Sequence, residues 1–139
     1  MELDKVAILI KKAALEFDKS TNALLERYDL TTPQYKVMKY LYEESDKGVR
    51  IVDLEKYYSM THPTTIGIVQ NLEKKGLVEY RNNPDNARSR FIVPTAEANR
   101  LKEELILLGE EMEQALTENL TPEEKDEMIT LLKKMLGIS

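Results

Sequence analysis

Apolar residues recur at every third or fourth position along much of the chain, and this spacing is typical of amphipathic helices. The first stretch covers residues 3–28 and predicts one long helix, either continuous or broken near residues 20–22. A second stretch predicts a helix from about Thr32 to Glu44, in which Thr32 is the N-cap and Pro33 the first helical residue. The chain therefore begins with two helices joined by a short connection.

Three shorter elements are predicted next, from the apolar spacing and from residues that begin or end helices. They are a strand at residues 49–51, a helix at residues 52–58 and a helix at residues 61–75. Either Ser59 or Thr61 is the N-cap of the last helix, and Gly76 ends it. Two helices thus follow one another with only a short turn between them.

The helix at residues 61–75 has two different faces. The face predicted to be buried holds Ile66, Ile68, Val69 and Leu72. The other face and the start of the helix carry small polar residues, namely Thr61, His62, Pro63, Thr64, Gly67, Gln70, Asn71 and Lys74. Asparagine and glutamine can pair with adenine in the major groove of DNA, and threonine can contact the methyl group of thymine. The face is therefore either a base-reading surface or an ordinary solvated one.

A predicted hairpin follows this helix and favours the first interpretation. Residues 77–80 and 91–93 alternate like strands, and the turn between them contains Asn, Pro and Asp. Three arginines, Arg81, Arg88 and Arg90, lie around this turn. A short helix, a helix with a polar face and a basic hairpin together predict a winged helix-turn-helix, in which the hairpin reaches phosphates or the minor groove.

The last part of the chain predicts two more amphipathic helices. One follows a cap at Thr95 and carries leucines at helical spacing up to Leu116, and Thr121 opens the other. Together with the first helix, they present more apolar surface than one small lobe can cover. We expect this surface to be buried between the subunits of a homodimer, the alternative being a three-helix pack within one chain.

Charge is unevenly distributed along the 139 residues, whose net charge is −5. Residues 31–100 carry 11 Lys and Arg against 9 Asp and Glu, whereas residues 101–139 carry 4 against 10. The predicted winged helix is therefore the mildly basic part of an acidic chain. Screening limits the influence of a charge to about 8 Å, so a local basic face can attract DNA despite the negative total.

The sequence argues against catalysis and against bound metal. It contains no cysteine and a single histidine, His62, and it shows neither a phosphate-binding loop nor a nucleophile motif. We therefore expect no enzyme activity, no metal and no cofactor. His62 is expected either to contact a phosphate or to complete the helix cap. No stretch predicts a membrane span, and the composition favours the cytoplasm.

Three segments carry a resemblance to a known family. They are LTTPQYKVMKYL at residues 30–41, MTHPTTIGIVQNLEKKGLVEY at residues 60–80 and NPDNARSRFIVPTAEA at residues 83–98. The chain resembles the MarR family of transcription regulators over essentially its whole length. The resemblance implies a mainly α fold (α+β winged helix) in a single domain spanning residues 1–139. In that domain, residues 1–30 and 101–139 form dimerisation helices, and residues 31–100 form the DNA-binding lobe.

The resemblance also implies a function and assigns roles to residues of the wing. A homodimer of this family straddles a pseudo-palindromic operator on double-stranded DNA and usually represses transcription. Arg88 matches the arginine at the tip of the family's wing, and Asp85 matches an acid that steadies it. Gly67 and Asn71 stand where arginine is frequent in the family, which implies less direct reading of guanine.

Regulation and partner class remain open at the level of sequence. Similar proteins bind small aromatic or anionic effectors in a crevice. Six aromatic residues can line such a crevice or belong to the core, namely Phe17, Tyr28, Tyr35, Tyr40, Tyr57 and Tyr58. The sequence assigns no effector pocket. The alternative function is a winged-helix module that binds protein rather than DNA, and such a module predicts no salt-sensitive association with duplexes.

Overall fold

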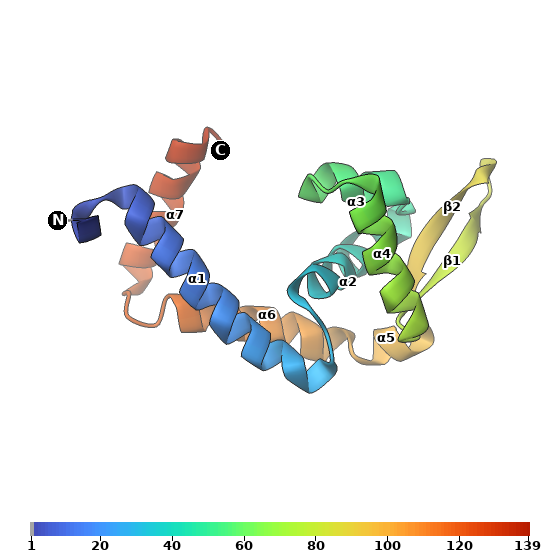
Figure 1. The fold of residues 1–139 in the computed structure, drawn as a ribbon, viewed down its shortest axis with the longest axis horizontal. Coiled ribbons are helices and arrows are strands. Elements are labelled where there is room, and N and C mark those ends of the chain that lie inside the picture. The colour runs from blue at the N-terminus through green and yellow to red at the C-terminus, as the bar shows by residue number, and fades with distance from the viewer. Residues whose placement is uncertain (1) are drawn as a thin grey trace. The chain divides into compact units, whose positions relative to one another are not determined.

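The computed structural model describes residues 2–139, which form helices and one two-stranded antiparallel sheet (Figure 1). In chain order the elements are α1 (Val6–Leu25), α2 (Thr32–Glu44), α3 (Ile51–Tyr58), α4 (His62–Lys74), β1 (Val78–Asn83), β2 (Asn86–Pro94), α5 (Ala96–Arg100), α6 (Lys102–Leu116) and α7 (Pro122–Leu136). Short 3₁₀ helices precede α1 and follow both α1 and α2. The mainly α winged-helix class predicted from the sequence is confirmed.

Backbone contacts divide the chain into two compact units. Thr21–Leu108 form the first unit, which we call the lobe. The residues up to Ser20 and Gly109–Ser139 form the second, which we call the helical unit. Helices α1 and α6 each contribute residues to both units, so the lobe is wider than the range 31–100 that the sequence indicated.

The lobe has a closed apolar core. Its buried side chains come from every helix of the lobe and from the sheet, and they include Leu25, Val37, Met38, Leu41, Leu54, Val69, Leu72, Val78, Ile92, Ala98 and Leu105. Two buried tyrosines of α2 extend this core. The hydroxyl of Tyr35 donates to the carbonyl of Leu105 over 2.8 Å, and that of Tyr42 donates to the carbonyl of Ala98 over 2.5 Å. These bonds tie α2 to the segment that follows the hairpin.

Helix ends mostly follow the predicted capping residues, with two corrections. Thr61, Thr95 and Thr121 are N-caps, and each accepts a hydrogen bond from a backbone N–H of the first turn. Helix α2, however, is capped by Thr31 rather than Thr32, because Thr31 and Gln34 form a reciprocal capping box. Helix α1 continues through residues 20–22 and ends at Leu25, and a 3₁₀ helix covers Glu26–Tyr28, so the predicted last turn is helical but not α-helical.

The strand predicted at residues 49–51 is not formed. Val49 makes only one isolated bridge, in which its carbonyl accepts the N–H of Ile92 over 2.7 Å. Arg50 then caps α3, which already begins at Ile51. The hairpin is longer than predicted, and an irregularity in its register lies between Asn82 and Asn83. Its turn is therefore confined to residues 84–85.

The helical unit differs from the lobe in having little buried surface. Met112 is the one buried side chain among its described residues, and no residue of α7 is buried. Large apolar side chains remain exposed along its helices and just after α7, namely Leu3, Val6, Leu9, Ile10, Leu15, Leu116, Met128, Ile129, Leu131, Leu132, Met135, Leu136 and Ile138. Within the described chain, none of the helices combines the length and apolarity that crossing a membrane requires.

Candidate nucleic-acid interface

Helix α4 presents the polar face that the sequence predicts. Seven of the eight candidate residues are exposed, and Gly67 is half-buried. The buried side is partly different from the prediction, because Thr65 is fully buried beside Val69 and Leu72 while Ile66 and Ile68 are only half-buried. Thr65 can occupy this position because its hydroxyl donates to the carbonyl of Thr61 over 2.8 Å.

The start of α4 is organised by Thr61 and not by His62. The Thr61 hydroxyl accepts the N–H of Thr64 and donates to the Thr64 hydroxyl over 2.9 Å. The ring of His62 instead places Nδ1 2.6 Å from Oε1 of Glu55 in α3. The expectation that His62 completes the cap is therefore wrong, and its contact with a phosphate stays a prediction.

Two side-chain amides of α4 have their hydrogen-bonding groups available. Gln70 and Asn71 are exposed, and neither side chain has a hydrogen-bond partner among the residues that the structure describes. Each amide offers both a donor and an acceptor, as required for pairing with the edge of adenine. The neighbouring cation Lys74 is also exposed.

Lys75, by contrast, has a structural role in the lobe. Its ammonium donates to the Gln34 side chain over 2.9 Å and to the carbonyl of Asp29. Asp29 adopts a left-handed conformation with φ 53°, and Gln34 belongs to the capping box of α2. Lys75 thus ties the end of α4 to the start of α2 instead of facing a ligand.

The tip of the hairpin is shaped by two asparagines. The Asn83 side chain accepts the N–H of Asp85 over 2.9 Å, and the Asn86 side chain accepts the N–H of Arg88 over 3.0 Å. Side-chain bonds of this kind stabilise tight turns. Asp85 takes part through its backbone, and the role expected for its carboxylate stays a prediction.

The three arginines of the hairpin have different surroundings. The guanidinium of Arg90 lies 4.0 Å above the ring of Tyr80, a geometry that holds it through a cation–π interaction. Arg81 is paired with Glu79 over 3.0 Å. Arg88 is exposed near the tip, and no described residue pairs with its guanidinium.

A cleft of about 310 Å³ joins this hairpin to α3 and α4 within the lobe. Its lining consists of Arg50, Ile51, Val52, Glu55, His62, Ile66, Tyr80, Arg88, Ser89 and Arg90. The structure therefore brings together His62, Arg88 and Arg90 from the sequence prediction, whereas Arg81 is not part of the cleft. Three guanidinium groups and a single carboxylate line it, so the cleft is suited to an anion.

Arg50 was missed by the sequence analysis. Its backbone N–H donates to Asp53 over 2.9 Å, and its guanidinium makes two further bonds of 3.4 and 3.2 Å to the same carboxylate. Burial raises the pKa of Asp53, but these bonds and the charges of Arg50 and Lys56 outweigh it and lower the pKa below its ordinary value. The sequence does contain a signal for this contact. Asp53 follows Arg50 by three residues at the start of a predicted helix, which is the spacing of a capping box.

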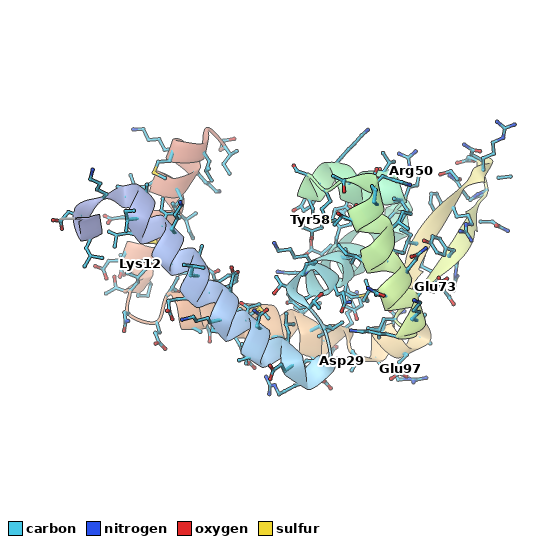
Figure 2. All side chains as sticks on the ribbon, viewed as in Figure 1. Lys12, Asp29, Arg50, Tyr58, Glu73 and Glu97 are labelled. Atoms are coloured by element: carbon cyan, nitrogen blue, oxygen red, sulfur yellow. The ribbon has the colours of Figure 1, made fainter. Side chains whose placement is uncertain are left out.

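Arg50 lies at the end of the lobe where α4 begins, and Glu97 lies at the opposite end (Figure 2). Tyr58 also lies near the start of α4. The rings of Tyr40, Tyr57 and Tyr58 contact one another there, with centroids 4.8 to 6.2 Å apart. Tyr35 instead belongs to the core, so the six aromatic residues do not line one crevice.

No group of three or more metal-ligating side chains occurs among the described residues. The chemistry that the surface offers is instead recognition, through amides on α4 and cations around the cleft.

Comparisons with known proteins agree with this geometry. The sequence profile of the MarR family matches residues 28–89. The transcriptional regulator HosA of Escherichia coli O111:H- is 30% identical over 109 residues, which cover 78% of this chain and 79% of HosA.

Two solved structures are similar along almost the entire chain. The S. aureus MepR–DNA complex has a TM-score of 0.85 and 29% identity, covering 96% of this chain and 97% of that one. A single-residue mutant of E. coli MarR complexed with operator DNA has a TM-score of 0.84 and 29% identity, covering 97% and 96%. The chain therefore belongs to the MarR family and is a transcriptional regulator.

Proposed function

We propose that this chain binds a pseudo-palindromic operator on double-stranded DNA as a homodimer and represses transcription in the cytoplasm. The observation that carries the proposal is the cleft, in which His62 and Ile66 of α4 lie against Arg88 and Arg90 of the hairpin. Because α4 and the hairpin share this surface, one duplex can meet both at once. The similarity to MepR and MarR, which were both solved in complex with DNA, supports the binding of a duplex.

Within this proposal the residues divide between base reading and backbone contact. Thr61, Pro63, Thr64, Gly67, Gln70 and Asn71 face the major groove, with Lys74 at the far end of α4. Arg50, His62 and Arg90 contact phosphates along the cleft, while Arg88 reaches the adjacent groove or its phosphates. Such backbone contacts fix the register of the protein on DNA, and base contacts supply specificity.

The homodimer is supported by the apolar side chains of the helical unit. Leu131 is 61% exposed and Leu136 is 69% exposed, and both lie on the last long helix. Large apolar side chains also remain exposed elsewhere on α7 and along α1, and extensive exposed apolar surface marks an interface with another molecule. A second copy related by a two-fold axis covers it and places two α4 helices about one turn of DNA apart, roughly 34 Å.

We further propose, on the family resemblance alone, that a small aromatic or anionic effector releases the operator. Any effector that binds the DNA-free form better than the DNA-bound form has this effect by linkage. Titration of a preformed complex with simple aromatic carboxylates tests it, and release at concentrations that leave the fold intact is the expected result.

Selection of bound sequences from a random duplex pool tests the main proposal. We expect an inverted repeat with half-sites about one helical turn apart, bound with strong salt dependence. Asn71→Ala should relax the base preference at one position of each half-site without changing the salt slope. Failure of the wild-type protein to bind any duplex in a salt-sensitive manner would instead favour the protein-binding winged-helix module.

A further inference from the structure

Gly67 occupies a position where the protein itself does not need a glycine. It lies inside α4, where glycine destabilises a helix relative to alanine. A Cβ atom built at this position meets no heavy atom within 4 Å, and φ is not in the left-handed region. Neither packing within the lobe nor backbone conformation therefore explains the residue.

The surroundings of Gly67 on the helix surface point to an external reason. One turn earlier lie Pro63 and Thr64, and one turn later lie Gln70 and Asn71, all of them exposed. Residues three and four apart are neighbours on a helix, so the missing side chain leaves a notch between these four residues. The two unpaired amides border the notch on one side.

We propose that this notch receives the C5 methyl group of a thymine in each operator half-site, so that Gly67 is a specificity-determining residue. The inference rests on the proposed binding of operator DNA. An amide of Gln70 or Asn71 can pair with N6 and N7 of an adenine, and a thymine methyl projects into the same groove from its own or a neighbouring base pair. A β-carbon at residue 67 occupies the volume that this methyl group needs.

Uracil substitution in the selected operator tests the proposal, because uracil lacks the methyl group and keeps base pairing. Each thymine is replaced in turn in both half-sites. For the wild-type protein, one position should weaken binding by about fourfold per half-site, the value expected for losing one buried methyl group. For Gly67→Ala, the same replacement should instead strengthen binding, because uracil lacks the methyl group that overlaps the added β-carbon.

Gly67→Ala should also change the stability of the fold and the affinity for the operator in opposite directions. It should raise the thermal midpoint by about 2–5 °C, because alanine is the better helix former. It should weaken operator binding roughly 5- to 100-fold through overpacking. Affinity for unrelated duplexes and the salt slope should stay unchanged, because no phosphate contact is altered.

Asn99→Ala is a matched control, since it also places alanine at an exposed helical position but lies on α5. It should change neither operator affinity nor the uracil profile. The proposal is overturned if wild-type and Gly67→Ala proteins bind the operator equally, or if no thymine depends on its methyl group. These two results overturn the role of Gly67 but leave the proposed function intact, provided that the wild-type protein still selects an operator. If the wild-type protein selects no sequence at all, the proposed function is overturned as well.

Discussion

The two units of this chain differ in how completely each covers its own apolar side chains. In the lobe, Leu41 and Leu72 are wholly inaccessible to solvent, and hydrogen-bonded tyrosines close the edge of the core. In the helical unit, α7 has no buried residue and Leu131 is 61% exposed. The residue types are similar, but only the lobe has neighbours within the chain that bury them.

This difference indicates that the two units have different roles. The lobe has the closed core that a fixed recognition surface requires, because core packing sets the positions of α4 and the hairpin. The helical unit carries the surface on which a second copy of the chain is proposed to pack. If the lobe recognises DNA and the helical unit joins the subunits, substitutions in the two units should have different effects, given below from the largest to the smallest.

Placing two carboxylates on α7 should separate the subunits. Leu132→Asp combined with Met135→Asp should give a monomer in analytical ultracentrifugation. It should also weaken operator binding by roughly 10²- to 10⁴-fold, because binding of the two half-sites is no longer linked. Lys134→Ala, on the other side of α7, is the control and should leave both measurements unchanged. A double variant that remains dimeric would show that another surface joins the subunits.

The same substitution made in each unit should have different consequences. Leu41→Ala should lower the free energy of unfolding by about 2–5 kcal/mol, whatever the protein concentration, because it leaves a cavity in a closed core. Leu131→Ala should act mainly on the dissociation of the dimer, so its effect on the melting temperature should depend on protein concentration. Equal, concentration-independent losses in both variants would contradict the division between the units.

Neutralising the tip of the hairpin should weaken DNA binding without changing the stability of the lobe or the association of the subunits. Arg88→Ala should weaken binding to all duplexes about tenfold and lower the slope of log K against log salt by about one. The measurement is fluorescence anisotropy at several salt concentrations. Arg100→Ala removes the same charge from α5, where Arg100 pairs with Glu97, and should change the slope little. An unchanged slope for Arg88→Ala would exclude a phosphate contact at this position.

The smallest effect is expected at the edge of the lobe core and depends on pH. Burial raises the pKa of Tyr42 to about 12, above the ordinary value of about 10. The stability contributed by its neutral hydroxyl is therefore complete below pH 10 and is lost as the pH rises toward 12. Tyr42→Phe should cost about 1 kcal/mol near neutral pH. In urea titrations the difference from wild type should shrink over that alkaline range, and a constant difference would argue against this ionisation.

Local patterns in the sequence were sufficient for much of the fold. The polar face of α4, the caps at Thr61, Thr95 and Thr121 and the hairpin each depend on residues a few positions apart. Their predictions succeeded because backbone hydrogen bonding and helical spacing operate over that range. The errors at residues 49–51 and at the end of α1 concern boundaries, where competing caps differ by little free energy.

The sequence by itself determined which helix carries exposed amides and which hairpin carries the arginines. Only the tertiary structure decided that Arg50 joins Arg88 and Arg90 at one cleft, that His62 pairs with Glu55, and that Lys75 binds the start of α2. Each of these contacts joins side chains from different elements, whose distance depends on how the core packs. No periodicity along the chain encodes such a distance, because it arises only when the buried leucines and valines fix the helices against the hairpin.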